Sequence, residues 1–334
     1  MKAILAAAFV VANLIGCGGH EPSAPGISGA PADPAVAAIT KLGGRIDIDQ
    51  ANPDHPVIGV HLGRTKLNDA GMAAFNKLPH LQQLQVFQTQ IGDAGLENLE
   101  GLSHLTVLNL NSTKVGDEGL AHVKGLVSLK QLNLNDSKVG DHGLANLASL
   151  SRLEELWLAN TSVGDAGVAH LKACKSLQVL NLQGTQVTDQ GLEALAGLIE
   201  MRKLVLSNTQ INGSGLVHLK ECSKLEELDL ADTAVTDEGL VFLTELPNLQ
   251  KLWLSNTKIS DDGLKDLGKI SSLVELALTG TGVSDAGMDH LVGLKKLSIL
   301  HVPQTRVTWD GATKIKNAIP ASFIPPYHDA GKKK

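Results

Sequence analysis

Hydrophobic residues return at a fixed interval along most of this chain. From Val57 onward the pattern LxxLxLxxTxVxDxGLxxLxxLxx recurs every 24 residues without a gap, in eleven units that end at Pro320. Repetition at this interval indicates a solenoid, in which each unit buries its hydrophobic residues against its neighbours. The units begin at Val57, Leu81, Leu105, Leu129, Leu153, Leu177, Met201, Leu225, Leu249, Leu273 and Leu297.

The first half of each unit, with positions numbered 1 to 24, predicts a short strand and a bend. Leucine at positions 1, 4 and 6 gives a strand with inward side chains, as in Leu105, Leu108 and Leu110. Position 9 is Thr in ten units and Ser137 in the other. A small hydroxyl residue there can turn inward and bond backbone groups of the bend.

The second half of each unit predicts a short helix. Position 13 is Asp in nine units, and we interpret this Asp as the N-cap of the helix. Glycine at position 15 of all eleven units predicts a close approach between neighbouring helix starts. Gly213 replaces the Asp in the seventh unit, where Asn212 or Ser214 can cap instead. Trp309 replaces it in the eleventh, where we expect it to cover the final core layer.

The segment before the repeats predicts a cap for the open edge of the sheet. Residues 34–42 have the composition of a short helix that ends at Gly43 and Gly44, and residues 45–49 alternate like a strand. We expect this strand to pair with residues 57–62. The predicted organisation is an N-terminal cap over 35–56, the repeats over 57–320 and a C-terminal tail over 321–334.

The repeated unit resembles leucine-rich repeats. The Leu-x-x-Leu-x-Leu strand followed by Asp-x-Gly-Leu-x-x-Leu is most similar to the helix-bearing class of F-box proteins, the cysteine-containing and GALA-like repeats, and related bacterial repeat proteins. Thr at position 9 departs from that class, where Asn or Cys is usual. The resemblance implies an α/β fold, a right-handed leucine-rich-repeat solenoid shaped as an arc or horseshoe. Its parallel β-sheet lines the concave face, and short helices form the convex face.

The beginning of the chain resembles a bacterial lipoprotein signal. Lys2 precedes an apolar run over residues 3–15, which is shorter than the roughly 20 residues that span a bilayer. The run ends in the letters LIGC, which resemble a lipobox. The resemblance implies that residues 1–16 are a signal peptide and that Cys17 carries fatty acyl chains such as palmitate, which anchor the protein in a membrane. An ordinary secretory signal is the alternative.

Residues 17–34 predict a flexible tether between the lipidated Cys17 and the repeats. Eight of the seventeen residues from Gly18 to Pro34 are Gly or Pro, which do not pack a core. Gly18 stands where an Asp marks retention at the inner membrane in well-studied enteric bacteria. We therefore expect a lipid-anchored protein of the bacterial cell envelope and periplasm, at the outer rather than the inner membrane.

Composition and motifs argue against several classes of protein. Aromatic residues make up only 3% of the chain, which suits thin stacked layers. Its net charge of −6 and scattered basic residues argue against a nucleic-acid partner. We find no catalytic, phosphate-binding or metal-binding motif, so we expect no cofactor, no metal and no enzymatic activity. Cys174 and Cys222 both occupy position 22, two units apart, and we expect them to be buried and unbridged.

The candidate binding surface is the concave face, where positions 3, 5, 7 and 8 project away from the core. Position 5 places two tryptophans on this face, and exposed tryptophan is enriched in binding hot spots. The alternative is that the indoles merely cover aliphatic neighbours such as Val179 and Val205. The predicted binding residues are Phe87, Asn109, Asn133, Trp157, Asn181, Asp229, Trp253 and His301.

Charges alternate along position 3 of four adjacent units. These residues are Lys203, Glu227, Lys251 and Glu275. Opposite charges on adjacent strands stabilise a sheet, so we interpret them as a cross-strand ladder rather than a ligand site.

The expected function is protein binding through the concave face, with the membrane reached through the lipid on Cys17. A carbohydrate or cell-wall ligand, held by the same aromatic and Asn side chains, is the alternative. A third interpretation, substrate recognition in a ubiquitin ligase, follows only from the repeat class. The export signal and the lack of an F-box-like segment before the repeats argue against it.

Overall fold

The computed structural model describes residues 34–320 and 322–323, which belong to one structural unit that starts at Pro34. The predicted signal peptide, Cys17, the tether up to residue 33 and most of the C-terminal tail lie outside the described residues. The eleven predicted repeats therefore fall within the described part of the chain.

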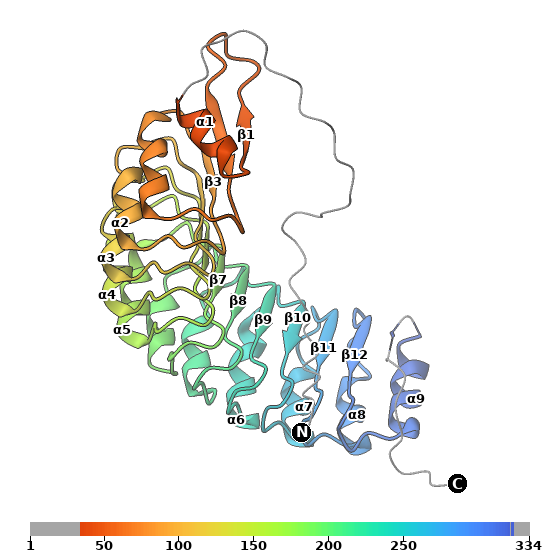
Figure 1. Cartoon of the computed structure of the whole chain (residues 1–334). Coiled ribbons are helices and arrows are strands. Elements are labelled where there is room, and N and C mark those ends of the chain that lie inside the picture. Colours follow the sequence, from red (N-terminus) through yellow and green to blue (C-terminus); the bar gives the residue numbers. More distant parts are fainter. Residues whose placement is uncertain (1–33, 321, 324–334) are drawn as a thin grey trace, which may run out of the picture. The chain divides into compact units, whose positions relative to one another are not determined.

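A twelve-stranded sheet runs through this unit in chain order, as Figure 1 shows. Its first two strands pair antiparallel, and every later pair is parallel with partners 24 residues apart, such as Leu108 and Leu132. The predicted parallel-sheet solenoid is confirmed. The strands are β1 (Arg45–Ile48), β2 (Val57–His61), β3 (Gln83–Gln85), β4 (Val107–Asn109), β5 (Gln131–Asn133), β6 (Glu155–Trp157), β7 (Val179–Asn181), β8 (Lys203–Val205), β9 (Glu227–Asp229), β10 (Lys251–Trp253), β11 (Glu275–Ala277) and β12 (Ile299–His301).

The core consists of identical layers, one from each repeat. Positions 1, 4, 6, 11, 16, 19 and 22 turn inward, and in the third repeat Leu105, Leu110, Val115 and Leu120 are fully buried. Each layer covers the next, so the leucines of one repeat are removed from water only when a neighbour is present. The 24-residue period thus dictates both the strand register and the burial.

The strands line the inside of the curve of this unit, and short helices lie along its outside (Figure 1). Most begin with an α-helical turn, and the first, sixth and seventh repeats have 3₁₀ geometry instead. The α-helices are α1 (Pro34–Lys41), α2 (Asp93–Leu96), α3 (Asp117–Leu120), α4 (Asp141–Leu144), α5 (Asp165–Ala169), α6 (Asp237–Leu240), α7 (Asp261–Leu267), α8 (Asp285–Leu291) and α9 (Trp309–Ala318). The 3₁₀ helices are η1 (Asp69–Lys77), η2 (Glu97–Leu99), η3 (Ala145–Leu147), η4 (His170–Ala173), η5 (Gly191–Leu195), η6 (Ser214–Leu219) and η7 (Val241–Glu245).

The repeats begin against a helix and a strand, as predicted. In α1, Ile39 is buried to 1% exposure. The helix ends at Lys41, and Gly43, two residues later, has a φ of +80° that suits glycine. β1 then pairs with β2, Arg45 opposite His61. The antiparallel β1 occupies the edge of β2 that a preceding repeat would otherwise fill.

The interpretation of the position 13 Asp as an N-cap is wrong. In the third repeat the N-cap is Gly116, and Asp117 is the first helical residue. Its Oδ1 instead accepts a hydrogen bond from the backbone N–H of Gly140 in the next repeat, at 2.6 Å. The same bond recurs along the array and links helix starts of adjacent repeats. We call this row of aspartates the aspartate ladder: Asp69, Asp93, Asp117, Asp141, Asp165, Asp189, Asp237, Asp261 and Asp285.

The predicted role of Trp309 is also wrong. Its side chain is 73% exposed at the start of α9. Position 13 is the first helical residue and points away from the core, whereas the fully buried Ile315 of the same helix points inward. The last strand is flanked instead by Phe323, whose N–H donates to the Ser298 carbonyl at 2.6 Å.

The predicted role of the position 9 hydroxyls is confirmed. Thr113 Oγ1 donates to the carbonyl of Leu110 at 2.7 Å, and the ten threonines share this bond to the residue three positions earlier. Ser137 is the exception, because its buried Oγ has no hydrogen-bond partner. Cys174 and Cys222 are buried and unbridged, as predicted.

Candidate binding face

The strands present a partly exposed face on the side away from the helices. In β6, for example, Leu156 is buried while Glu155 and Trp157 on either side of it remain partly exposed. We call the surface formed by positions 3, 5 and 7 of the repeats the strand face. All eight predicted binding residues are partly exposed, seven at position 5 of their repeats and Phe87 at position 7.

Four polar residues at position 5 have a structural role that was not predicted. Asn133 Oδ1 accepts a hydrogen bond from the backbone N–H of Asn135 at 3.0 Å. Asn109, Asn181 and Asp229 accept the corresponding bond two residues later, at 2.9–3.0 Å. Their oxygens therefore hold the bend after the strand. The amide nitrogens of the three asparagines are the groups left to meet a ligand.

Asp229 is the one carboxylate among the four. Burial raises the pKa of its carboxyl above the ordinary value, although the hydrogen bonds from the Ala231 backbone and the Ser207 side chain oppose the shift. Because this carboxylate bonds the backbone of the bend that follows its own strand, we expect it to stabilise the bend more than to bind a ligand.

The second tryptophan lies in a network of charges. Trp253 Nε1 donates to Glu275 Oε1 at 3.1 Å, and His301 Nε2 lies 3.9 Å from the same oxygen. The predicted charge ladder is confirmed for Lys203 and Lys251, which both lie 2.7 Å from the carboxylate of Glu227. Burial by itself raises the pKa of Glu227, but the two lysines outweigh it and the pKa is lowered.

The first tryptophan has different neighbours. Trp157 lies between Asn133 and Asn181 in the sheet register, and Glu155 lies between Gln131 and Val179. Gln131 Nε2 donates to Glu155 Oε1 at 3.0 Å. Burial raises the pKa of Glu155; the Gln131 bond opposes this shift, and the charge of Glu154 adds to it.

Phe87 contacts two residues of the first repeat. The Arg64 guanidinium lies 5.7 Å from the centroid of the Phe87 ring, within the range of a cation–π interaction. Gly63 also lies so close to the ring that a Cβ added to it would collide with Phe87. Phe87 is thus fixed in place at the N-terminal end of the array.

The backbone at position 8 has a left-handed conformation that was not predicted. Every residue there has a positive φ, from +53° to +72°, in all eleven repeats. Seven of the eleven are Asn, Asp or Gly, the residues that adopt this conformation at least cost, and that composition was the available signal. The side chains also bond across repeats, as Asn160 Nδ2 does to Asp136 Oδ1 at 2.9 Å.

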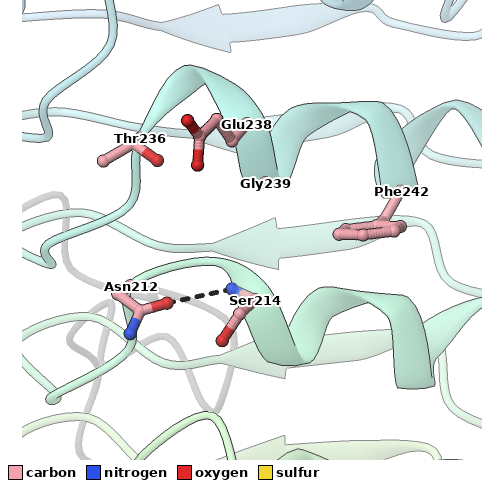
Figure 2. A pocket seen from close by; sticks show the side chains of 6 residues that line it. All are labelled: Asn212, Ser214, Thr236, Glu238, Gly239 and Phe242. Atoms are coloured by element: carbon pink, nitrogen blue, oxygen red, sulfur yellow. Dashed lines mark hydrogen bonds between the residues drawn. The ribbon is translucent and has the colours of Figure 1, made fainter.

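The helix side has a hollow of about 270 Å³ at the point where Gly213 interrupts the aspartate ladder, drawn in Figure 2. Asn212 Oδ1 accepts from the Ser214 N–H at 3.1 Å, but the N-cap of η6 is Gly213, which has no side-chain cap bond, so the prediction that Asn212 or Ser214 is the cap is wrong. Glu238 is the one ionisable residue of the six that line the hollow, which argues against acid–base chemistry there. Within residues 34–320 and 322–323, no three His, Cys, Asp or Glu side chains are grouped to bind a metal ion.

The fold and the repeat agree with one family. The family model described as "Leucine-rich repeat region" matches residues 60–295, and the chain belongs to the leucine-rich repeat family. The chain matches none of the curated proteins. Within the described residues, no helix is long and apolar enough to cross a membrane.

Solved structures with the same fold come from bacteria and plants. An internalin from Listeria monocytogenes is 21% identical, with a TM-score of 0.59 over 90% of this chain and 96% of that one. A leucine-rich repeat protein from Leptospira interrogans is 20% identical, with a TM-score of 0.53 over 76% and 74%. A plant peptide hormone receptor, RGFR1 in complex with RGF2, is 15% identical, with a TM-score of 0.50 over 84% and 51%.

Proposed function

We propose that this chain is a non-catalytic, lipid-anchored envelope protein that binds another protein through its strand face. The observation that carries the proposal is the arrangement of Phe87, Trp157 and Trp253, three partly exposed aromatic side chains on one side of a continuous sheet. Partly exposed aromatic rings on a rigid scaffold supply much of the binding energy in protein interfaces.

The family supports the proposal at a coarser level. Leucine-rich repeat proteins are generally non-catalytic binding scaffolds, and the plant receptor neighbour is a complex with RGF2. Specificity in such folds comes from the surface residues of each chain. The partner of this chain must therefore be sought with its own strand face.

A pull-down from solubilised membranes tests the strand face. The wild-type chain is compared with the double variant Trp157→Ala/Trp253→Ala, and Trp309→Ala serves as the matched control because it removes an exposed tryptophan away from this face. We expect the double variant to lose its captured partner and the control to retain it. A partner retained equally by all three proteins would contradict binding through these tryptophans.

The lipid anchor on Cys17 and an outer-membrane location are part of the proposal. They are supported by the LIGC sequence, the apolar run before it and Gly18 after it. Incorporation of radiolabelled palmitate into the wild-type chain but not into Cys17→Ser tests the anchor, and separation of inner and outer membranes tests the location. Label in both proteins, or in neither, would contradict lipidation at Cys17.

A carbohydrate or cell-wall ligand is the second candidate. Trp157 between Asn133 and Asn181 favours it, because an aromatic ring flanked by amide donors suits a sugar. Retention of the chain by pelleted peptidoglycan, lost in Trp157→Ala, would support this candidate over a protein ligand. We also propose that the repeats belong to the subclass found in F-box proteins. A role in a ubiquitin ligase is not part of this proposal, because the proposed export signal argues against it.

A further inference from the structure

The two tryptophans of the strand face occupy equivalent positions but differ in how the nearby carboxylates are neutralised. Trp157, in β6, and Trp253, in β10, are both at position 5 of their repeats. Around Trp253 the cations belong to the chain itself: Glu227 is bound by Lys203 and Lys251. Glu275 accepts from the Trp253 indole and lies near His301. The carboxylates there are already engaged.

Glu155 beside Trp157 has no such counterion in the described part of the chain. Among the described residues no Lys, Arg or His side chain forms an ion pair with it, and its neighbours in the sheet, Gln131 and Val179, are uncharged. The charge of another carboxylate, Glu154, contributes to raising its pKa, and Glu154 itself pairs with Lys130 at 2.8 Å. A half-buried carboxylate with one neutral donor has lost hydration without gaining a cation in exchange.

Glu155 and Trp157 project from the same side of one strand. Residues two apart in a strand share a face, with Cα atoms about 6.5 Å apart. A cation seated against the Glu155 carboxylate is therefore within reach of the indole face, since cation–π attraction acts within about 6 Å of a ring centroid. The amide groups of Asn133 and Asn181 flank the indole without adding charge.

We propose that Glu155 and Trp157 form a subsite for a cationic side chain, Lys or Arg, of the partner protein. This inference rests on the proposed function and names the chemistry of the partner at one point of the strand face. The carboxylate supplies the counter-charge and the indole supplies the cation–π contact. In β10 the residue two before Trp253 is Lys251, so a lysine of the protein itself stands where β6 has Glu155.

The full chain contains three tryptophans, so ¹⁵N-tryptophan labelling gives three indole N–H signals. Each is assigned with one Trp→Phe variant. The probe is the peptide acetyl-Lys₄-amide, compared with acetyl-Arg₄-amide and neutral acetyl-Ser₄-amide, at about 50 mM salt to limit screening. We expect the basic peptides to shift the Trp157 signal in a saturable way and to leave Trp253 and Trp309 unmoved.

The decisive variant is Glu155→Gln, which keeps the shape of the side chain and its contact with Gln131. We expect it to weaken peptide binding at Trp157 by about three- to tenfold. Glu227→Gln is the matched control, because it removes the same charge from the same face at a carboxylate that is already paired, and it is expected to change binding less than about twofold. Glu155→Asp, which retains the charge, is expected to retain most of the binding.

Equal binding by wild type and Glu155→Gln, a shift of Trp253 as large as that of Trp157, or equal shifts with the serine peptide would each overturn the subsite. The pull-down separates this failure from that of the proposed function. A partner lost in Trp157→Ala/Trp253→Ala but held fully by Glu155→Gln leaves strand-face binding standing and removes only the cationic subsite.

Discussion

Gly119 lies so close to Asp93 that a Cβ added to the glycine would come within 2.6 Å of Asp93 Oδ1. The same carboxylate oxygen accepts the N–H of Gly116, at the start of the same helix, at 2.6 Å. The repeated Asp and the repeated Gly therefore act together in the contact between adjacent repeats. The glycine of each repeat makes room for the aspartate of the preceding repeat, which joins the two helix starts.

Replacing Gly119 by Ala is expected to destabilise the protein by about 1–3 kcal/mol, because the new methyl group must push Asp93 and its hydrogen bond aside. This outweighs the helix propensity that Ala gains over Gly. Gly125→Ala is the matched control, since nothing lies within 4 Å of a Cβ placed there. The control is expected to be neutral or slightly stabilising. Urea denaturation followed by circular dichroism measures both, and equal effects would contradict the steric explanation.

Removing a rung of the ladder is the complementary change. Asp117→Ala leaves the Gly140 N–H without its acceptor, and we expect a loss of about 1–3 kcal/mol. The adjacent Glu118→Ala changes the same charge at an exposed residue and is expected to cost less than about 0.5 kcal/mol. Hydrogen exchange of the α3 and α4 amides locates the loss. Faster exchange spread evenly over all repeats, instead of centred on these two helices, would argue against a local link.

The sequence predicted the layers of the solenoid well because a 24-residue period leaves few ways to bury the leucines. It did not predict which partner each polar residue would take. Asp93 was interpreted as a cap because a carboxylate before a helix usually serves its own helix, yet its partner, Gly116, lies 23 residues later. Contacts between repeats depend on how the units stack, and no local pattern encodes that distance.

The binding face illustrates the same limit. The period correctly put Trp157 and Trp253 on one side of the sheet, since alternation along a strand is a local property. Whether Asn133 meets solvent or its own bend depends on the backbone after the strand. That backbone includes the positive φ at position 8, and the only signal for it in the sequence is that Asn, Asp and Gly predominate at this position of the repeats.

Ser137→Thr is expected to stabilise the protein by about 0.5–1.5 kcal/mol. Ser137 Oγ is buried and lacks a hydrogen-bond partner, whereas each Thr at this position donates to the carbonyl three residues earlier. The added methyl favours the rotamer that makes the bond to Leu134. The reverse change, Thr113→Ser, is expected to destabilise. Urea midpoints test the pair, and a change of the same sign in both variants would contradict the explanation.

The two buried thiols, Cys174 and Cys222, are expected to resist modification in the folded protein. Burial raises the pKa of each from 9.0 to about 11, with Glu221 adding to the shift at Cys222, so little reactive thiolate forms at pH 8. The unfolded chain releases these protons near pH 9 while the folded chain keeps them. Stability from this source is therefore complete below pH 9 and is lost as the pH rises towards 11. The test uses Cys17→Ser, which leaves only these two thiols, and Ellman's reagent at pH 8. We expect no reaction in buffer and two equivalents in guanidinium chloride, and a rapid native reaction at either residue would show that its repeat opens more readily than this burial implies.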